Sequence, residues 1–221
     1  MKDQLATQDY IKTIAQLVIK NDVEIIKNKQ IALKLGVTIA AVNDMAKKLE
    51  KDGLILIHAY KGVELTDRGE KMGLKLIRHH RLWEVFLHQT LDMPWHLIHD
   101  EAEFLEHAAS NDLMNRIDTY LGYPKFDPHG NPIPSASGEL IFNENEIQLT
   151  QCKVGVRYAL LRFESIDSSY LDYLSQQGFA ISTHIQVVEF FDFDRSVVID
   201  IQGKHLQLSY QVAKQIFVSI I

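Results

Sequence analysis

The segment from Asn28 to Leu65 restricts the fold of this chain more than any other part. Apolar residues at helical spacing predict a short helix over 28–35, which ends at Gly36, the usual residue for a left-handed C-terminal cap. Thr38 follows as an N-cap candidate, and a second apolar stripe predicts a helix over 39–51. A tight turn therefore joins the two helices.

A β-hairpin is predicted directly after the second of these helices. Residues 54–58 form a β-branched run, a turn falls at 60–62, and residues 63–65 return the chain. Helix, tight turn, helix and hairpin is the order of a winged helix-turn-helix, although a generic small α+β domain has the same order. In the winged interpretation, the candidates for DNA groove, phosphate and wing contacts are Thr38, Asn43, Lys47 and Lys61.

The distribution of charge limits the partners of the chain. Its 221 residues are enough for two or three small domains, and the formal net charge is −6. Residues 1–70 contain eleven Lys and Arg against ten Asp and Glu, whereas the remainder contains twelve against nineteen. The charge excludes a uniformly basic protein that coats nucleic acid. The N-terminal part is the candidate region for contacts with DNA phosphate.

Cysteine content and hydropathy indicate the compartment. Cys152 is the only cysteine in the sequence, so there is no internal disulfide framework. The sequence has no apolar run as long as a membrane-spanning helix, and its N-terminus does not resemble a signal peptide. These features predict a cytosolic protein without a membrane partner.

Two further predicted helices carry chemically useful residues. A helix over 6–20 is expected to place Asp9 near its N-terminus. A long helix over 66–91 carries His80 and Glu84, which lie one turn apart on the same face.

Large apolar residues are frequent in the predicted helices over 66–91, 99–107 and 112–121. The predicted N-terminal domain has no further apolar surface that could cover these side chains. Uncovered apolar faces of this kind indicate self-association, for which a two-fold homodimer is the usual arrangement.

The segment from His99 to His107 contains four carboxylates and two imidazoles within nine residues and still has a helical pattern. On a helix, His99, Glu103, Glu106 and His107 fall on one stripe. Like charges on one stripe need solvent or a cation, so a solvated acidic face and a divalent metal site are both open.

Residues 123–138 contain four of the five prolines and are predicted to form a loop. Within it, the proline of Asp127-Pro128-His129 stiffens the backbone between two potential metal ligands. After Glu139, a short helix around 170–176 and several strand-like runs predict a small β-barrel or sandwich; the runs are 157–163, 186–191, 197–201 and 215–220.

Four motifs, in this order along the chain, resemble the diphtheria-toxin-repressor family of metal-dependent transcriptional repressors, most closely its manganese-sensing branch. The motifs are Gln8–Tyr10, His80–Leu87, His99–His107 and Gly122–Gly130. The resemblance covers nearly the whole chain and implies an α+β fold of three domains. These are a winged helix-turn-helix DNA-binding domain over 1–66, an all-helical metal-binding and dimerisation domain over 67–138, and a C-terminal SH3-like barrel of the ferrous-transport accessory type over 139–221.

The resemblance also implies two metal sites. The first would use Asp9, His80, Glu103, Glu106 and His107. The second would use Glu84, Asp127, His129 and, from the barrel, Glu164. Singly, each residue has an ordinary explanation as a helix cap, a hydrogen-bonded histidine or a solvated carboxylate. Their joint occurrence in the family's order favours metal binding.

The sequence departs from the family pattern at two of these positions. Asp127 stands where many relatives have cysteine, and Lys12 stands where some manganese sensors have glutamate. A charged lysine cannot ligate, so a paired-ion arrangement is not expected. Asp9 stands where iron sensors tend to have methionine. Because all predicted ligands are oxygen or imidazole, the chemistry favours Mn²⁺, with Fe²⁺ or another divalent metal as the alternative.

The sequence as a whole predicts a Mn²⁺-dependent repressor that binds a pseudo-palindromic operator in double-stranded DNA as a homodimer and controls metal-uptake genes. The alternatives are an iron-responsive repressor of the same family and a metal-independent winged-helix regulator. A metalloenzyme is a rival class, because Glu-x-x-Glu-His also occurs in di-metal helical bundles. It is not favoured, since the sequence has one such motif where a bundle needs two and shows no nucleophile arrangement.

Overall fold

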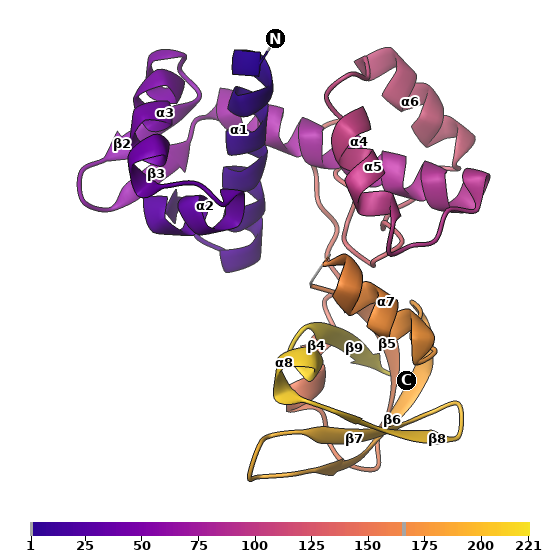
Figure 1. Cartoon of the computed structure of the whole chain (residues 1–221). Coiled ribbons are helices and arrows are strands. Elements are labelled where there is room, and N and C mark those ends of the chain that lie inside the picture. The colour runs from indigo at the N-terminus through magenta and orange to yellow at the C-terminus, as the bar shows by residue number, and fades with distance from the viewer. Residues whose placement is uncertain (1, 165–166) are drawn as a thin grey trace. The chain divides into compact units, whose positions relative to one another are not determined.

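The computed structural model describes residues 2–164 and 167–221 (Figure 1). The chain divides into two compact units. The first comprises Met1–His80, Glu103–Arg116 and Pro134–Leu140, and the second comprises Arg81–Ala102, Ile117–Ile133 and Ile141–Ile221. The first predicted metal site lies within the first unit, and the second predicted site lies within the second.

The N-terminal part of the first unit is a winged helix-turn-helix. Its elements are α1 (Lys2–Asn21), β1 (Ile25–Ile26), α2 (Asn28–Leu35), α3 (Ile39–Lys51), β2 (Ile55–His58) and β3 (Gly62–Leu65). The strands form an antiparallel sheet in the order β1-β3-β2. The predicted helices and hairpin are confirmed, and β1 is an edge strand that the sequence pattern did not predict.

Local sequence determines where these helices begin and end. Gly36 adopts a left-handed φ of 65° and ends α2. Thr38 Oγ1 accepts a backbone hydrogen bond at 3.1 Å and begins α3. Thr66 Oγ1 accepts one from the Gly69 N–H at 3.1 Å at the start of α4 (Asp67–Leu91). N-caps of this kind stabilise a helix by about 1 kcal/mol each.

Helices α1 and α4 approach each other closely at Gly73. A Cβ atom at this position would lie 2.5 Å from Ala15 Cβ, so only glycine fits without a shift of one helix. On α1, Ile11 and Ile14 are buried in the core of the first unit. This packing brings the polar face of α1 to the end of the first unit's portion of α4, where His80 lies.

Two expectations about the helices were wrong. Because α1 already begins at Lys2, Asp9 lies in the interior of the helix and not near its N-terminus, so it is not a helix cap. Helix α5 (Ile98–Leu105) ends before Glu106 and His107, which lie in the following turn. The turn is stabilised by contacts that local periodicity does not contain, including the contact of His79 Nδ1 with the Glu106 carbonyl oxygen at 3.3 Å.

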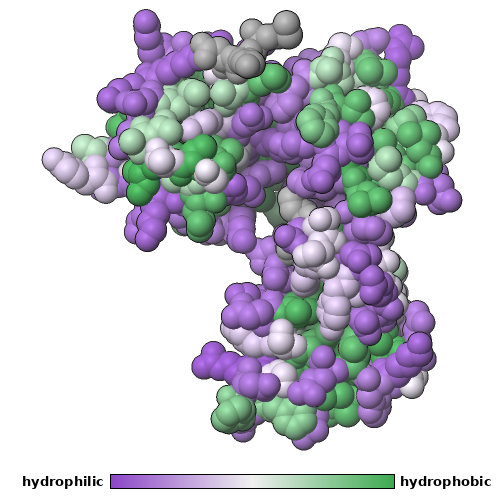
Figure 2. Space-filling model, viewed as in Figure 1, coloured by the Kyte–Doolittle hydropathy of each residue, from purple (hydrophilic) through white to green (hydrophobic). Residues whose placement is uncertain are grey.

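Large apolar side chains remain exposed in the helical region (Figure 2). Phe104 on α5 is 79% exposed, Leu113 on α6 (Asn111–Tyr120) is 43% exposed, and Tyr120 at the end of α6 is 69% exposed. Exposed apolar side chains of this size are consistent with the predicted self-association. Among the helices of the described residues, none combines the length and the apolar character needed to cross a bilayer.

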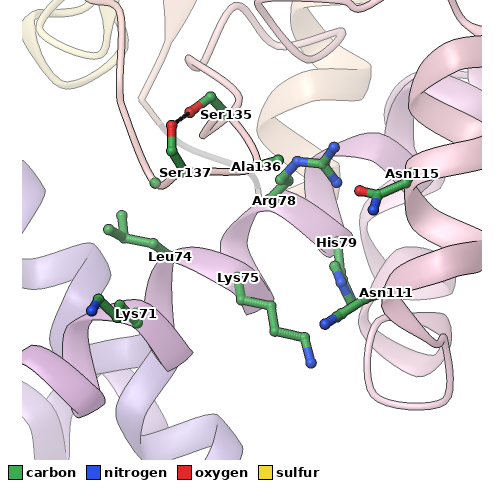
Figure 3. Close-up of a pocket in the computed structure, with 11 residues that line it drawn as sticks. Lys71, Leu74, Lys75, Arg78, His79, Asn111, Asn115, Ser135, Ala136 and Ser137 are labelled. Atoms are coloured by element: carbon green, nitrogen blue, oxygen red, sulfur yellow. Dashed lines mark hydrogen bonds between the residues drawn. The ribbon is translucent and has the colours of Figure 1, made fainter.

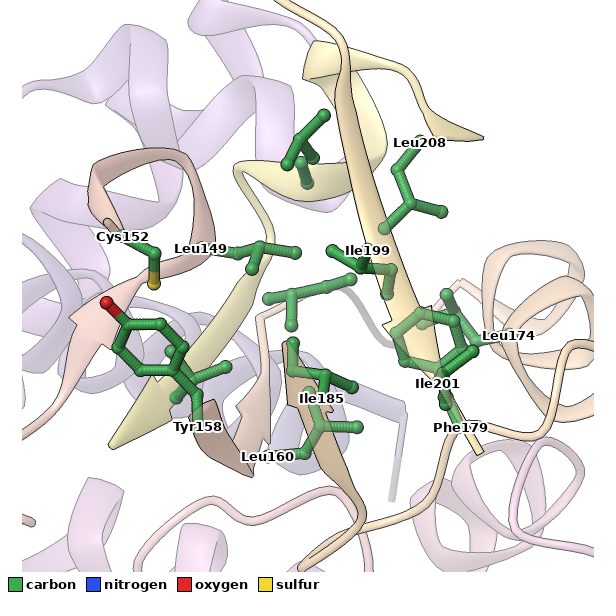
Figure 4. Close-up of a cluster of buried hydrophobic side chains, with 14 of the residues drawn as sticks. Leu149, Cys152, Tyr158, Leu160, Leu174, Phe179, Ile185, Ile199, Ile201 and Leu208 are labelled. Atoms are coloured by element: carbon green, nitrogen blue, oxygen red, sulfur yellow. The ribbon is translucent and has the colours of Figure 1, made fainter. Parts of the chain in front are cut away.

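The C-terminal part of the second unit is an antiparallel sheet of six strands in the order β4-β9-β5-β6-β7-β8. The strands are β4 (Ile147–Gln148), β5 (Arg157–Phe163), β6 (His184–Phe190), β7 (Val197–Ile201), β8 (Lys204–Leu208) and β9 (Ile216–Ile220). The short helical elements are η1 (Leu149–Gln151), α7 (Ser168–Gln176) and α8 (Tyr210–Ala213). The sheet encloses a continuous apolar core that includes Tyr158, Leu160, Ile185 and Ile199 (Figure 4).

The loop after α6 packs directly on β5. Gly130 has a φ of 86°, and a Cβ atom there would lie 1.9 Å from the Leu161 carbonyl oxygen. The Phe163 N–H donates to the His129 carbonyl oxygen at 2.9 Å. Gly130 is therefore required for the backbone contact that positions His129 against the barrel.

Replacing Gly130 by alanine is expected to lower the free energy of unfolding by about 2–4 kcal/mol, because the new Cβ both strains the positive φ and meets backbone. Gly155→Ala is the matched control, since Gly155 has a φ of 80° and nothing within 4 Å of its Cβ position. Denaturant unfolding followed by tryptophan fluorescence measures both variants. Equal losses of unfolding free energy in the two variants would show that the contact with β5 does not contribute to stability.

Candidate metal centres and DNA-binding surface

Side chains from α1, α4 and the α5–α6 connection converge in the first unit; we call Asp9, Lys12, His80, Glu103, Glu106 and His107 the helical cluster. One potential ligand atom from each of Asp9, Glu103 and His107 lies within 4.8 Å of the other two. His107 Nε2 lies 3.1 Å from Asp9 Oδ1 and 3.3 Å from Glu106 Oε1. The structure thus brings all five predicted ligands of the first site into one cluster.

The hydrogen bond of His107 determines which ring nitrogen is available to an ion. Its Nδ1–H donates to Gln8 Oε1 at 2.7 Å. In the neutral ring, Nε2 therefore carries the lone pair, and it faces the carboxylates of Asp9 and Glu106. A metal-binding histidine is usually oriented by a hydrogen bond of this kind from its other nitrogen.

Lys12 is the unexpected member of the helical cluster. Its Nζ donates to Glu106 Oε2 at 2.5 Å and to Glu103 Oε2 at 2.7 Å. His80 Nδ1 lies 3.3 Å from the same Nζ and 2.6 Å from Glu106 Oε2. The lysine therefore contacts three residues that the sequence assigned to metal binding, and the sequence pattern contained no sign of these contacts.

Burial and like charge raise the pKa of Asp9. Desolvation is the largest cause, Glu103 and Glu106 add to it, and His107 and Lys12 oppose it. Glu106 is 1% exposed, and its Oε1 has no hydrogen-bond partner within the described part of the chain. Carboxylates held close together in this way bind a cation or a proton more readily than isolated ones.

A second group of ligand atoms lies in the second unit; we call Glu84, Asp127 and His129 the loop cluster. Their exposed fractions are 2%, 6% and 0%, respectively, and their ligand atoms lie within 4.8 Å of one another. Glu84 Oε1 is 3.6 Å from His129 Nδ1. His99 Nδ1 also lies 3.4 Å from Glu84 Oε1, so His99 contacts this cluster although the sequence did not include it among the ligands.

His129 presents a lone pair to Glu84. Its Nε2–H donates to the Trp95 carbonyl oxygen at 2.8 Å, so the neutral ring has no proton on Nδ1. Nδ1 is buried and, among the described residues, has no hydrogen-bond partner. A buried imidazole lone pair facing a buried carboxylate is unfavourable unless a proton or a metal ion lies between them. The loop cluster therefore fits a metal ion.

Asp127 shapes the loop and contributes charge to it. Its Oδ1 accepts hydrogen bonds from the N–H groups of His129 at 2.8 Å and Asn131 at 2.9 Å. Arg81 Nε lies 3.6 Å from its Oδ2. Burial and Glu84 raise the pKa of Asp127, whereas His129, Arg81 and the Asn131 hydrogen bond lower it.

Glu164, the predicted barrel ligand, does not belong to the group of ligand atoms formed by Glu84, Asp127 and His129 in the described residues. It follows β5 directly, and its N–H donates to the Gln215 carbonyl oxygen at 2.9 Å. The neighbouring Phe163 N–H donates to the His129 carbonyl oxygen, so the backbone of Glu164 lies close to the loop in space.

The donor chemistry of both clusters is oxygen and imidazole. The only cysteine, Cys152, is buried in the barrel core, and burial raises the pKa of its thiol to about 11. A protonated, buried thiol does not ligate a metal. Carboxylate and imidazole donors suit Mn²⁺ and Fe²⁺.

The four predicted DNA contacts all lie on exposed parts of the winged helix-turn-helix. Thr38 caps α3, Asn43 Oδ1 accepts from Asn28 Nδ2 at 2.7 Å, and Lys47 Nζ lies 3.4 Å from Asp44. Lys61 lies in the β2–β3 turn, where its N–H donates to the His58 carbonyl oxygen. The surface of α3 and the tip of the hairpin are thus open to a ligand.

A basic cavity of about 390 Å³ lies elsewhere in the first unit (Figure 3). Lys71, Lys75 and Arg78 of α4 line it together with Asn111 and the 135–138 segment, in which Ser135 and Ser137 are hydrogen-bonded to each other. No predicted site residue is among its lining residues in the described part of the chain. The cavity is therefore separate from both clusters.

A winged helix-turn-helix in one chain with one partly buried and one buried carboxylate–imidazole cluster is the arrangement of a metal-responsive DNA-binding regulator. Family models agree with this class over almost the whole chain. The model described as the iron-dependent repressor N-terminal DNA-binding domain matches residues 5–63, the iron-dependent repressor metal-binding and dimerisation domain matches 66–135, and the FeoA domain matches 147–220.

Solved structures and curated relatives show the same relationship. A manganese-dependent transcriptional repressor in complex with manganese is 32% identical with a TM-score of 0.86, covering 97% of this chain and 100% of its own. The manganese regulator SloR is 34% identical with a TM-score of 0.78, covering 97% of this chain and 98% of its own. The iron-dependent repressor IdeR of Mycobacterium tuberculosis is 32% identical over 128 residues, which are 58% of this chain and only 55% of that relative.

The chain belongs to the diphtheria-toxin-repressor family of metal-dependent transcriptional repressors, in its three-domain form with a C-terminal FeoA (SH3-like) domain. This family consists of DNA-binding regulators and not of enzymes, in agreement with the sequence-based prediction.

Proposed function

We propose that this protein is a manganese-responsive repressor that binds operator DNA as a homodimer. In the helical cluster, Asp9, Glu103, Glu106 and His107 would hold one divalent ion, and His80 would support Glu106. In the loop cluster, Glu84, Asp127 and His129 would hold a second ion, with Glu164 as a candidate further ligand. When bound, the ions supply positive charge to two groups of closely spaced carboxylates.

The observation that carries this proposal is the orientation of His129. Its Nδ1 lone pair is buried, faces Glu84 Oε1 at 3.6 Å and receives no hydrogen bond from any described residue. A buried polar atom without a partner costs about 1–3 kcal/mol, which an ion in this position would offset. His107 shows the same pattern, with one nitrogen bonded to Gln8 and the other facing two carboxylates.

We assign DNA binding to residues 1–66, metal binding and dimerisation to 67–138, and the FeoA domain to 139–221. The family models over 5–63, 66–135 and 147–220 support these boundaries. Within the first domain, Thr38, Asn43 and Lys47 would contact the major groove or phosphate, and Lys61 would contact the backbone from the wing.

A homodimer is supported by the dimerisation-domain match and by exposed apolar side chains such as Phe104. Two-fold symmetry of the protein predicts a pseudo-palindromic operator with half-sites about one helical turn, or ~34 Å, apart. We place the protein in the cytoplasm, because a DNA-binding repressor acts in the compartment that contains its operator DNA. Metal-uptake genes are its proposed targets.

Manganese is the proposed metal because the donor atoms include no sulfur and because the manganese repressor and SloR match nearly the full chain. Iron is the second candidate, because IdeR and the diphtheria toxin repressor of Corynebacterium efficiens are also relatives. Affinity order alone would favour Zn²⁺ over both, so geometry and metal supply must provide selectivity.

The helical cluster is where metal and DNA binding would be coupled. It joins Asp9 on α1, within the DNA-binding domain, to Glu103 on α5 and to the turn at His107. An ion that holds these residues together would restrict the position of α1. If metal strengthens DNA binding by about 1–3 kcal/mol, DNA must strengthen metal binding by the same amount.

The test is metal-dependent binding of the full chain to duplex DNA selected from a random pool by the Mn²⁺-loaded protein. EDTA is expected to abolish DNA retardation, and Mn²⁺ is expected to restore it with an affinity gain of about 5- to 150-fold. Parallel anaerobic titrations with Fe²⁺ and Zn²⁺ rank the metals. Indifference to EDTA would support a metal-independent regulator and contradict the proposal.

A further inference from the structure

A lysine lies at the point where three predicted metal ligands meet. Lys12 is only 4% exposed, and its Nζ is 2.5 Å from Glu106 Oε2, 2.7 Å from Glu103 Oε2 and 3.3 Å from His80 Nδ1. All four residues belong to the first unit. The two carboxylate oxygens supply the acceptors that a buried ammonium needs, because an unpaired buried charge is strongly unfavourable.

Two carboxylate oxygens accept hydrogen bonds from the Lys12 ammonium group. The 2.7 Å between Lys12 Nζ and Glu103 Oε2 is the length of a charge-assisted N–H···O bond, and Glu106 Oε2 lies at 2.5 Å. Glu106 Oε2 also accepts from His80 Nδ1 at 2.6 Å. Lys12 and His80 together therefore use the hydrogen-bonding capacity of this side of the Glu106 carboxylate.

A separate set of ligand atoms remains on the other side of Glu106. His107 Nε2 lies 3.1 Å from Asp9 Oδ1 and 3.3 Å from Glu106 Oε1. Glu106 Oε1 has no hydrogen-bond partner among the described residues. The two oxygens of one carboxylate thus face two different positions, of which the ammonium of Lys12 occupies one.

The formal charge of the helical cluster also indicates one metal ion next to the ammonium group of Lys12. Three carboxylates (Asp9, Glu103 and Glu106) and the single ammonium of Lys12 leave a formal charge of −2 with neutral histidines. One divalent ion neutralises this charge, and a second would leave the cluster with a net positive charge. Without the ammonium, a carboxylate at position 12 would leave a charge of −4, which suits two divalent ions.

We propose that the ammonium group of Lys12 is a permanent part of the helical cluster and takes the place of a second metal ion. The cluster then binds one ion through Asp9, Glu106 Oε1 and His107, with Glu103 shared between that ion and Lys12. His80 donates a hydrogen bond from Nδ1 to Glu106 Oε2 and is not a metal ligand. This inference rests on the proposed metal-binding function and specifies its stoichiometry.

The first test changes the charge at position 12 in the full-length chain. Wild type and Lys12→Glu are equilibrated with Mn²⁺, and bound manganese per chain is measured by dialysis and atomic absorption. Lys12→Glu is expected to bind one more ion than wild type. Electron paramagnetic resonance is expected to show a magnetically coupled manganese pair in the variant and uncoupled ions in wild type.

The second test removes the charge while keeping the length of the side chain. Lys12→Met is expected to lower the melting temperature of the metal-free protein, because Glu103 and Glu106 lose their shared counter-ion. It is also expected to bind its Mn²⁺ about tenfold or more tightly, since a nearby positive charge has been removed. Lys20→Met, an exposed lysine on the same helix, is the control and is expected to match wild type in both measurements.

The outcomes separate this inference from the proposed function. A coupled manganese pair in wild type, or equal stoichiometry in wild type and Lys12→Glu, would overturn the role of Lys12 while leaving metal binding intact. Unchanged metal-free stability in Lys12→Met would also overturn it. Absence of Mn²⁺ binding in wild type would overturn both.

Discussion

Replacing Glu106 and His107 together by alanine is expected to abolish the manganese-dependent increase in DNA affinity. The double variant removes two proposed ligands of the helical cluster, and with Glu106 it also removes a carboxylate that is 1% exposed and bonded to Lys12 and His80. Loss of a buried ion-pair partner costs about 3–5 kcal/mol, so the metal-free protein should also melt at a lower temperature. Fluorescence anisotropy of labelled operator DNA, with and without Mn²⁺, measures the effect.

The single variant His107→Ala separates loss of metal from loss of stability. It leaves the Lys12–Glu106 ion pair in place, so the fold should be preserved while the response to metal disappears. Glu101→Ala, an exposed carboxylate on α5, serves as the matched control and should behave as wild type. A manganese response within about twofold of wild type in His107→Ala would contradict the assignment of the helical cluster.

Replacing His129 by phenylalanine is expected to remove one bound metal ion per chain. Phenylalanine keeps a buried ring next to Trp95, whose ring centroid lies 5.7 Å from that of His129, but it has no lone pair to offer. Because even residues that only orient a ligand change metal affinity by about 10- to 100-fold, loss of the ligand itself should exceed that range. Equilibrium dialysis with Mn²⁺ measures the stoichiometry.

Two controls make this result specific. His205→Phe changes a barrel histidine whose side chain is 66% exposed and should leave the stoichiometry unchanged. Glu84→Gln removes the facing negative charge with little change in shape and should reproduce the loss seen in His129→Phe. If both Glu84→Gln and His129→Phe bind as much manganese as wild type, the loop cluster is not a metal site.

The regular elements were largely predictable, because their signals are local. Gly36 and Thr38 mark the turn between α2 and α3, and the predicted bounds of β5 and β7 agree with the structure. The strands that were missed are short or polar. β1 and β4 have two residues each, and β8 (Lys204–Leu208) carries exposed polar side chains, so they form through pairing with a neighbour and not through their own pattern.

The candidate metal residues could be grouped from sequence only through the order of motifs. The helical stripe from His99 to His107 correctly marked an unusual region, but it continued the helix through Glu106 and His107. In the structure His99 contacts Glu84 on another helix, and α5 ends before Glu106. Side-chain periodicity describes one helix, whereas the partners of these residues lie on others.

The amino-acid sequence by itself determined the winged helix-turn-helix and the oxygen and imidazole chemistry of the candidate ligands, because caps, periodicity and residue type act over a few neighbouring positions. Tertiary structure alone decided that His129 turns its Nδ1 lone pair toward Glu84 and that Lys12 reaches Glu106, 94 residues away. Such contacts depend on where packing brings the backbone, as at Gly73 against Ala15 and Gly130 against β5, and no local pattern encodes those distances.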